Sequence, residues 1–286
     1  MKMALIVYFS QGGTTATVAT EISNGLRDNG YEADIYSITD ESPPDIKQYD
    51  LIGIGSPIYI YRPPFNVIAY VNDLPDLNGL PFFVFMLHGT HPGTAGNFLR
   101  KRLEQKGGRE VGYSRFKGAD YFVGYIQRGV MFSPDNPVPD ELERARRFGR
   151  VSAEYASGKE YDKPPGDPLP PILYSLERML TIKPLLNYFY SYFFKADTAK
   201  CSSCGLCVKI CPQNNIKLDK DGMPGWGRNC MFCGYCELKC PEDAVITPLG
   251  WTVFAPLLLY NIHHSKNDPS IEYVPVIHKK GKTKRL

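Results

Sequence analysis

Eight cysteines, the only ones in the chain, lie between residues 201 and 240 in two runs of identical spacing. Each run reads C-x-x-C-x-x-C-x-x-x-C-P, so three thiols recur at intervals of three and a fourth precedes a proline. Thiols at this interval allow one short loop to surround an iron–sulfur cluster. Such clusters exchange single electrons, so the sequence predicts redox chemistry. The runs are Cys201, Cys204, Cys207 and Cys211, then Cys230, Cys233, Cys236 and Cys240.

Two other uses of cysteine fit this pattern less well. Structural zinc takes four ligands, usually as two separated pairs and often with histidine. Disulfide frameworks belong to small secreted chains, whereas this sequence has 286 residues and Met1-Lys2 leads straight into an apolar segment, without a signal peptide. Iron–sulfur ligation is therefore the preferred interpretation.

The stretch from Ala199 to about Thr247 resembles the bacterial two-cluster ferredoxins, both in the cysteine runs and in the residues that follow each run. The resemblance implies that the cysteine before each proline ligates the other cluster. It also implies that Ile216 and Ile246 pack against the clusters. The implied ligands are Cys201, Cys204, Cys207 and Cys240 for one [4Fe–4S] cluster, and Cys230, Cys233, Cys236 and Cys211 for the other.

The N-terminal part begins with a continuous apolar run over residues 3–9, which predicts a central parallel strand buried on both faces. A helical pattern with Val18, Ile22 and Leu26 on one face starts soon afterwards. A strand, a turn of glycines and hydroxyls and a helix together form an anion site, because the helix N-terminus offers unpaired N–H groups. The turn consists of Ser10, Gln11, Gly12, Gly13, Thr14 and Thr15.

The strand and helix patterns then alternate. Five strands with helices between them predict an α/β doubly wound five-stranded parallel sheet, which binds ligands beyond the carboxyl ends of its strands. No G-x-G-x-x-G follows the first strand, which argues against a nicotinamide site. The further strands are expected over 32–37, 50–56, 81–88 and 121–125, the helices over 64–73, 94–106 and 138–157, and the ligand loops at 10–15, 56–62 and 88–96.

Residues 1–158 resemble the flavodoxins, and the whole chain resembles flavodoxin–ferredoxin fusion proteins of anaerobic microbes. The flavodoxin loop S/T-x-T-G-x-T holds the FMN phosphate, and Ser10, Gly13 and Thr15 match it. Gly12 stands where that loop has a hydroxyl, which implies one phosphate donor fewer and weaker FMN binding. Thr14 is placed to compensate.

The second and third loops carry the rest of the resemblance. The second is similar to the family's G-S-P-x-Y segment beside the flavin ring, and Tyr59, then Tyr61, is the candidate to stack on the isoalloxazine. The third is expected along the pyrimidine side of the ring, where its glycines allow N–H groups to approach N1 and O2. His88 and His91 are expected at the flavin edge rather than as metal ligands. The implied FMN-binding residues are Ser56, Pro57, Ile58, Tyr59, Tyr61, His88, Gly89, Thr90 and Gly93, besides those of the first loop.

Residues 159–171 are rich in proline and are expected to form an extended, semi-rigid spacer. Residues 172–194 are apolar and aromatic, but charged residues and a proline interrupt them, which excludes a membrane-spanning helix. Two interpretations remain for them. Helices buried between modules or subunits are favoured by the scarcity of polar residues, and an interfacial membrane segment is the alternative.

Residues 251–260 form another apolar run, expected to be strand-like or packed over the ferredoxin module, and 279–285 form a basic tail expected to be solvated and mobile. The expected domains are 1–158 for the flavodoxin-like FMN domain, 159–198 for the linker and helical connector, 199–248 for the two-cluster ferredoxin domain and 249–286 for a C-terminal extension.

These features predict an intracellular electron-transfer protein that passes electrons between two [4Fe–4S] clusters and FMN, with other redox proteins as partners. One alternative is an FMN-dependent reductase of a small nitro, quinone or azo compound, fed through the ferredoxin domain. Another is a structural module that has lost its flavin. No catalytic residue is assigned.

A net charge of +3 with interspersed acidic groups gives nucleic-acid binding little support. Oxygen-sensitive clusters and reduced thiols favour a cytoplasmic, anaerobic setting. Homo-oligomers and a weak association with a membrane surface remain open.

Overall fold

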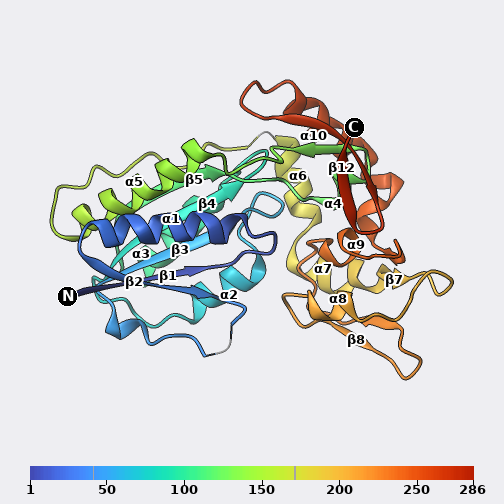
Figure 1. Ribbon diagram of the computed structural model, residues 1–286, viewed down its shortest axis with the longest axis horizontal. Coiled ribbons are helices and arrows are strands. Elements are labelled where there is room, and N and C mark those ends of the chain that lie inside the picture. Colours follow the sequence, from blue (N-terminus) through green and yellow to red (C-terminus); the bar gives the residue numbers. More distant parts are fainter. Residues whose placement is uncertain (41, 171) are drawn as a thin grey trace. The chain divides into compact units, whose positions relative to one another are not determined.

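The computed structural model describes residues 1–40, 42–170 and 172–286, and these fall into two compact units (Figure 1). Unit 1 consists of Met1–Ala119 and Asp135–Pro170. Unit 2 consists of Asp120–Pro134 and the described residues of Pro171–Leu286. The chain therefore leaves unit 1 for residues 120–134, which we call the excursion, returns to it at Asp135 and leaves it again after Pro170.

Unit 1 is built on a five-stranded sheet with the order β2-β1-β3-β4-β5. Every neighbouring pair is parallel, and the chain reverses its direction of winding between β1 and β3. This confirms the predicted doubly wound parallel sheet. The strands are β1 (Lys2–Tyr8), β2 (Tyr31–Ser37), β3 (Leu51–Pro57), β4 (Pro81–His88) and β5 (Arg109–Lys117).

Helices cover the sheet because alternate strand residues point to opposite faces. Ile6, Phe83 and Phe85 belong to one buried cluster with Val18 of α1 and Ala145 of α5, and in Figure 1 these two helices run together across that face. The neighbouring strand residues, such as Leu5 and Val84, are equally buried. The helices of unit 1 are α1 (Thr14–Asp28), the short η1 (Ile46–Gln48), α2 (Phe65–Asp73), α3 (Ala95–Gln105) and α5 (Pro139–Ala156).

The fifth strand differs from the prediction. Residues 121–125 do not form it; the strand is β5, Arg109–Lys117, which among the described residues pairs with β4 alone. As an edge strand, β5 carries charged residues that hide the pattern of a buried strand. The apolar run at 121–125 instead enters the short helix α4 (Val123–Ile126), whose Tyr125 is buried in a core of unit 2.

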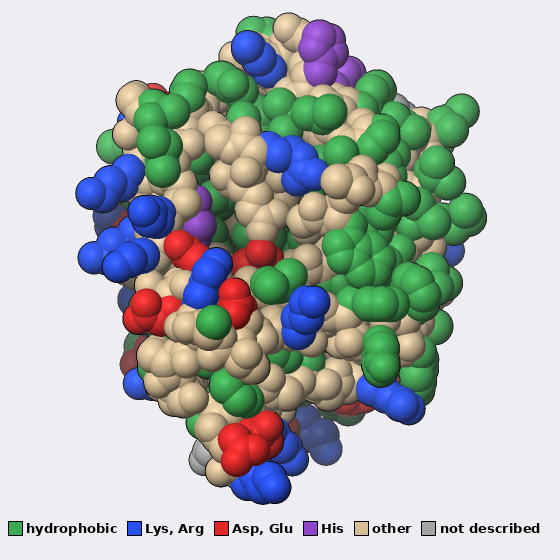
Figure 2. All heavy atoms as spheres, turned by 90° about the vertical axis from the view of Figure 1, so that its right-hand side faces the viewer, with side chains coloured by type: hydrophobic (Ala, Val, Ile, Leu, Met, Phe, Trp, Pro, Cys, Tyr) green, Lys and Arg blue, Asp and Glu red, His purple; other side chains and the backbone are tan. Residues whose placement is uncertain are grey.

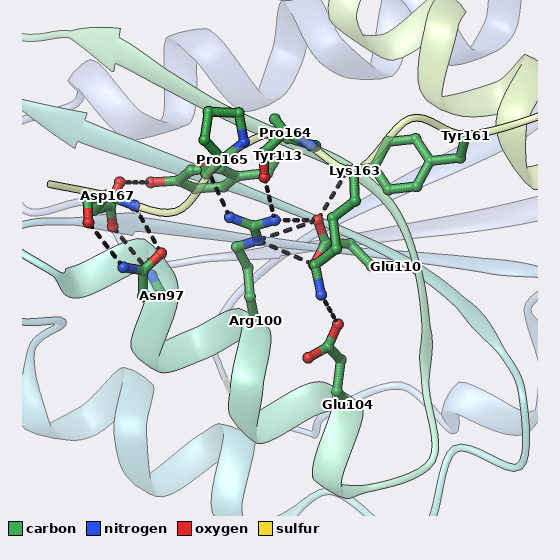
Figure 3. A network of polar contacts seen from close by, with 10 residues as sticks. All are labelled: Asn97, Arg100, Glu104, Glu110, Tyr113, Tyr161, Lys163, Pro164, Pro165 and Asp167. Carbon is green, nitrogen blue, oxygen red and sulfur yellow. Dashed lines mark hydrogen bonds and ion pairs between the residues drawn. The ribbon is translucent and has the colours of Figure 1, made fainter.

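A polar network fastens the proline-rich segment to unit 1 (Figure 3). Arg100 of α3 forms an ion pair with Glu110 of β5 at 2.8 Å, and both side chains are almost fully buried. The same guanidinium donates to the carbonyl of Pro164 at 3.0 Å, and Asp167 accepts a hydrogen bond from the backbone N–H of Asn97 at 3.0 Å. The segment has no helix or strand over 159–170 but lies fixed along unit 1; residue 171, the last of the predicted spacer, lies outside the described residues.

Unit 2 contains a small α+β part in which the two cysteine runs adopt equivalent backbone conformations. Gly205 and Gly234 precede equivalent short helices with φ of 70° and 66°, and Asn214 and Asp243 both have φ of 48°. β7 pairs with β10, and β8 pairs with β9, both antiparallel. The elements are β7 (Lys195–Ala196), α8 (Leu206–Lys209), β8 (Ile216–Leu218), β9 (Pro224–Trp226), α9 (Tyr235–Leu238) and β10 (Val245–Ile246).

A second part of unit 2 joins the excursion to the C-terminal region. β11 pairs with β6 and with β12, both antiparallel, and Phe132 packs with Leu258 and Ile271 in a buried cluster. The strand-like expectation for 251–260 is wrong, because these residues begin a helix, and the expected mobile tail at 279–285 includes a paired strand. The elements are β6 (Val130–Phe132), η3 (Pro248–Gly250), η4 (Thr252–Phe254), α10 (Ala255–Lys266), β11 (Tyr273–Lys279) and β12 (Lys282–Arg285).

The apolar segment after the proline-rich stretch is helical, as predicted. It forms α6 (Ile172–Leu180), α7 (Lys183–Tyr188) and η2 (Tyr190–Phe193). Tyr174, Leu186 and Tyr190 are buried in unit 2. Its predicted role in packing the two modules together stays a prediction. In the described parts of the chain, no helix has the length and apolar character needed to span a bilayer.

Candidate functional site

The three loops predicted to bind a ligand follow the carboxyl ends of β1, β3 and β4 and lie together in unit 1. The hydroxyl of Tyr59, after β3, donates to Gln11 Oε1, after β1, at 2.9 Å. The Tyr59 ring also meets Phe9 edge-on, with 6.2 Å between ring centroids. The backbone N–H of Ile58 donates to Leu87 O of β4 at 3.0 Å. These contacts define a site at the point where the strand order reverses, which is where open parallel sheets bind ligands.

The first loop has the features of an anion cradle. Gly13 precedes α1 with φ of 91°, and nothing lies within 4 Å of the place where a Cβ would stand. No side chain caps this end of the helix. Ser10 Oγ is buried and has no hydrogen-bond partner in the described structure. Unpaired N–H groups at a helix N-terminus and an unsatisfied buried hydroxyl fit a phosphate.

The second loop is a tight turn with a strained backbone. The N–H and carbonyl groups of Tyr59 and Arg62 pair with each other at 2.9 and 3.2 Å. Between them, Ile60 and Tyr61 have φ of 49° and 59°, which is rare for a β-branched residue and marks a conformation that its surroundings impose. A Cβ on Gly93 of the third loop would stand 2.8 Å from Tyr61 O, so only glycine fits there.

The third loop begins with His88, whose Nδ1 lies 2.9 Å from Thr90 O. Burial lowers the pKa of His88 to about 4, so the imidazole is neutral at pH 7, although the contact with Thr90 opposes the shift. A neutral ring can donate this hydrogen bond through Nδ1. The loop is thus held by a fixed side chain at its start and by glycine at its contact with the second loop.

The sequence-predicted flavin residues differ in their surroundings. Tyr59 is half-buried, whereas Tyr61 is only 7% exposed. Ser56 is fully buried and donates to Pro57 O at 2.7 Å, so its hydroxyl shapes the turn. The residues present fit a flavin nucleotide, with a phosphate cradle in the first loop and an aromatic ring in the second. The assignment of individual residues to FMN stays a prediction.

The first set of cysteines lines one cavity in unit 2. Cys201, Cys204 and Cys207 of the first run surround it together with Cys240 from the end of the second run. Leu218, Pro224 and Val245 complete its apolar wall. A cavity lined by three thiols of one run and the last thiol of the other has the donor set of a [4Fe–4S] cluster.

The thiols of the second predicted set lie in a buried environment. Burial raises the pKa of Cys230 to about 12, and the nearby thiols of Cys233 and Cys211 add to that shift. Burial likewise raises the pKa of Cys236 well above its usual value, with further contributions from Cys233 and Cys230. Buried neighbouring thiols ionise when a metal ion supplies the compensating charge. Cys211, from the first run, is thus close enough to Cys230 of the second to affect its ionisation, and its place as a ligand of the second cluster stays a prediction.

Backbone N–H groups approach the sulfurs at equivalent places in the two runs. Asn215 N lies 3.4 Å from Cys211 Sγ, and Ala244 N lies 3.2 Å from Cys240 Sγ. Such hydrogen bonds favour the thiolate and help to set a cluster's potential. Within the described residues, no group of three or more His, Cys, Asp or Glu is arranged to hold a single metal ion. Ligands of a four-iron cluster each bind a different iron and are therefore spaced more widely than the ligands of one ion.

One expected wall residue is corrected. Ile246 is 41% exposed, so the prediction that it packs against a cluster is wrong. Val245 is buried and lines the cavity, and it follows Cys240 at the same distance along the chain as buried Ile216 follows Cys211. Aligning the two runs on their cysteines would have identified Val245. Leu218 and Pro224 were also missed, because nothing in their local sequence marks a cluster wall.

Comparisons with known proteins agree with both parts. Residues 5–126 match the family described as Flavodoxin domain, and residues 200–244 match the family described as 4Fe-4S dicluster domain. An uncharacterized protein of Methanocaldococcus jannaschii is 29% identical over 157 residues, covering 51% of this chain and 95% of that protein.

Solved flavodoxins are also similar. A flavodoxin from the domain Archaea is 19% identical with a TM-score of 0.44, and the match covers 54% of this chain and 99% of that one. The flavodoxin of Megasphaera elsdenii is 22% identical with a TM-score of 0.43, covering 53% and 99%.

The family matches rest on the same residues as the site: the loops after β1, β3 and β4 lie within the first match, and the eight cysteines within the second. Flavodoxin domains carry electrons on FMN, and 4Fe-4S domains carry them on iron–sulfur clusters. The chain therefore joins a flavodoxin domain to a 4Fe-4S dicluster domain, which supports the predicted flavodoxin–ferredoxin fusion and a role in electron transport.

Proposed function

We propose that electrons pass within this chain between two [4Fe–4S] clusters and FMN, so that the protein joins one-electron to two-electron redox partners. The observation that carries the proposal is the cavity that Cys240 shares with Cys201, Cys204 and Cys207. This crossed set matches the ligation of two-cluster ferredoxins, and it occurs in a chain that also has a flavodoxin domain. FMN exchanges one or two electrons, whereas each cluster exchanges one.

The chain's own residues have distinct tasks in this proposal. Ser10 and the N–H groups around Gly13 hold the phosphate, and Tyr59 stacks on the flavin ring. The Gln11 hydrogen bond fixes the orientation of Tyr59, because its hydroxyl has a partner in the neighbouring loop. His88 and Gly93 shape the loop that offers N–H groups to the ring. The clusters are held by Cys201, Cys204, Cys207 and Cys240, and by Cys230, Cys233, Cys236 and Cys211.

The test is to count both cofactors in protein purified without oxygen. Acid extraction, chromatography and iron analysis should give about one FMN and about eight irons per chain. Eight irons without flavin, and no uptake of added FMN, would contradict the proposal that the chain binds FMN. Zinc in place of iron would contradict the proposal that the cysteines hold [4Fe–4S] clusters.

A second assay separates a carrier from a reductase. Reduced protein is mixed with oxidised ferredoxin or flavodoxin, and separately with nitro, quinone and azo compounds. A carrier should be oxidised rapidly by the redox proteins and show no saturable turnover with the small acceptors. Saturable turnover of one small acceptor, faster than oxidation by any redox protein, would identify a reductase instead. The cytoplasmic, anaerobic setting stays a prediction.

A further inference from the structure

A broad apolar surface in unit 2 has no role in holding either cofactor. It lies on the segment 172–193, where one side is buried in unit 2 through Tyr174, Leu186 and Tyr190. The opposite side is exposed. Ile172, Leu176, Met179 and Ile182 are exposed by 90%, 41%, 59% and 43%. Figure 2 shows that hydrophobic side chains gather over a wide area of the face that it presents.

The same surface continues along α7 and η2 with aromatic residues. Tyr188 and Tyr192 are 71% and 84% exposed, and Phe189 and Phe193 are 49% and 37% exposed. Phe193 meets the half-buried Trp251 edge-on at 4.8 Å between centroids, which extends the aromatic surface beyond the segment. We call residues 172–193 and Trp251 the aromatic face. Contiguous apolar surfaces of this kind are uncommon on isolated soluble domains and mark binding sites.

The charge at the aromatic face is positive. Lys183 and Lys195 are exposed, and the guanidinium of Arg228 lies 5.7 Å from the centre of the Tyr188 ring. The one acidic residue between 172 and 195 is Glu177, which accepts a hydrogen bond from Asn261 at 2.8 Å. Basic groups therefore outnumber acidic ones beside the exposed aromatics, which favours an anionic surface as the partner.

The composition matches the boundary between lipid headgroups and acyl chains. Tyrosine places an apolar ring and a polar tip at that depth, and lysine reaches outwards to the headgroups while its stem stays with the apolar groups. Interfacial helices combine these features without spanning the bilayer. Such helices bind through apolar contact together with the attraction of basic residues to anionic lipids, and Lys183, Lys195 and Arg228 stand beside the exposed aromatics.

We propose that the aromatic face docks unit 2 onto an anionic membrane surface. The sequence left two interpretations for this segment, helices buried between modules or subunits and an interfacial membrane segment, and the basic residues beside the exposed aromatics favour the second. Docking would bring the iron–sulfur part of the chain close to a lipid bilayer, where membrane-bound redox partners lie. The proposal goes beyond the electron-transfer function and does not depend on it.

Flotation of the intact holoprotein with vesicles tests the proposal. Vesicles containing phosphatidylglycerol should carry the protein upwards, whereas vesicles of phosphatidylcholine alone should carry much less, and added salt should release it. The variant with Tyr188→Ser and Tyr192→Ser should bind at least tenfold more weakly, because two exposed apolar anchors are lost. Replacing both residues by tryptophan should preserve binding.

Two further variants define the charge requirement and the control. Lys183→Gln and Lys195→Gln should each weaken binding about fivefold. Ile277→Ser changes another exposed apolar residue, 54% exposed on β11, and should leave binding unchanged. Iron content and circular dichroism should be the same in every variant, because the altered side chains are exposed.

Any of four results would overturn the proposal. The first is the absence of flotation with phosphatidylglycerol vesicles. The second is equal binding by the wild type and the Tyr188→Ser/Tyr192→Ser variant, and the third is equal binding to both kinds of vesicle. The fourth is an oligomer in size-exclusion chromatography that this variant disperses, which would show that the aromatic face joins two copies of the chain.

Discussion

The hydroxyl of Ser10 lies buried without a hydrogen-bond partner beside the open N-terminus of α1. If it donates to the FMN phosphate, Ser10→Ala should weaken FMN binding about tenfold or more, because hydrogen bonds to charged groups contribute about 1.5–3 kcal/mol. Riboflavin, which lacks the phosphate, should bind the variant and the wild type equally. Fluorescence titration of the flavin-free protein measures both.

Ser152 supplies the matched control for this titration. Its hydroxyl is also buried without a partner in the described structure, but it lies on α5, away from the three loops. Ser152→Ala should therefore leave FMN binding unchanged. Equal weakening by the two substitutions would mean that Ser10 acts through stability rather than through the phosphate.

His88 gives unit 1 a pH-dependent stability. Its pKa is about 4 in the folded chain, so the unfolded chain, with a pKa near 6.5, binds more protons between those values. The free energy of unfolding should therefore fall as the pH is lowered from about 7 towards 4. Burial is the main cause of the lowered pKa of His88; the charges of Lys117 and Arg115 lower it further, and that of Glu141 opposes them. Urea unfolding at several pH values should show that the free energy of unfolding falls less for His88→Gln than for the wild type as the pH is lowered. An equal fall in both proteins would mean that carboxylates cause the pH dependence.

The ion pair between Arg100 and Glu110 lies at the centre of the polar network shown in Figure 3. Arg100→Leu should destabilise unit 1 by about 3–5 kcal/mol, because it leaves the Glu110 carboxylate buried beside fewer partners. The double variant Arg100→Leu/Glu110→Leu should lose less free energy of unfolding than Arg100→Leu alone, because no buried charge is then left without its partner. Urea unfolding followed by circular dichroism measures both. A double variant less stable than Arg100→Leu would contradict the argument.

Among the secondary-structure elements, three of the four strands found from the sequence are strands whose burial shows in the chain itself. β1, β3 and β4 lie inside the sheet and read as apolar runs. β5 lies at the edge, where Glu110 is buried only because Arg100 of α3 neutralises it. A partner that is distant in the structure cannot be inferred from the local pattern, so this strand was misplaced.

The excursion 120–134 was missed for a related reason. Its apolar residues do mark burial, but β6 pairs with β11, which lies more than a hundred residues further along the chain. Local periodicity does not reveal such a pairing. The same pairing orders the C-terminal region that was expected to be mobile, because β12 pairs with β11 in turn.

The candidate site was more predictable than the fold around it. The cysteine spacing identifies its ligands without a structure, because thiols are scarce and their order is fixed by the chain. The three flavin loops followed from the strand order, since parallel strands end at one edge. What the sequence could not show was the close contact of Gly93 with Tyr61, or the burial that leaves Ser10 without a partner.

The crossing between the two cysteine runs can be tested with paired substitutions. If Cys211 ligates the second cluster, Cys211→Ala with Cys233→Ala should damage one cluster and leave about four irons per chain. Cys211→Ala with Cys204→Ala should damage both and leave almost none. Iron analysis after anaerobic reconstitution compares them. The reverse order of iron contents would show that each run holds its own cluster.

For the whole molecule, two compact units share one chain that passes between them at residues 119–120, 134–135 and 170–171. The proline-rich segment is fixed to unit 1 by Asp167, whose carboxylate accepts from Asn97 N and whose N–H donates to Asn97 Oδ1. Joining two redox modules in one chain raises the effective concentration of one near the other. Electron exchange within the chain should therefore outpace exchange between chains.

The central claim is that electrons pass between the clusters and the flavin of one chain. Flash photoreduction without oxygen delivers a single electron, and absorbance then follows the flavin and the clusters separately. The account predicts that one signal decays as the other grows, with a first-order rate that does not change when the protein is diluted. A rate proportional to protein concentration, or no exchange at all, would contradict it.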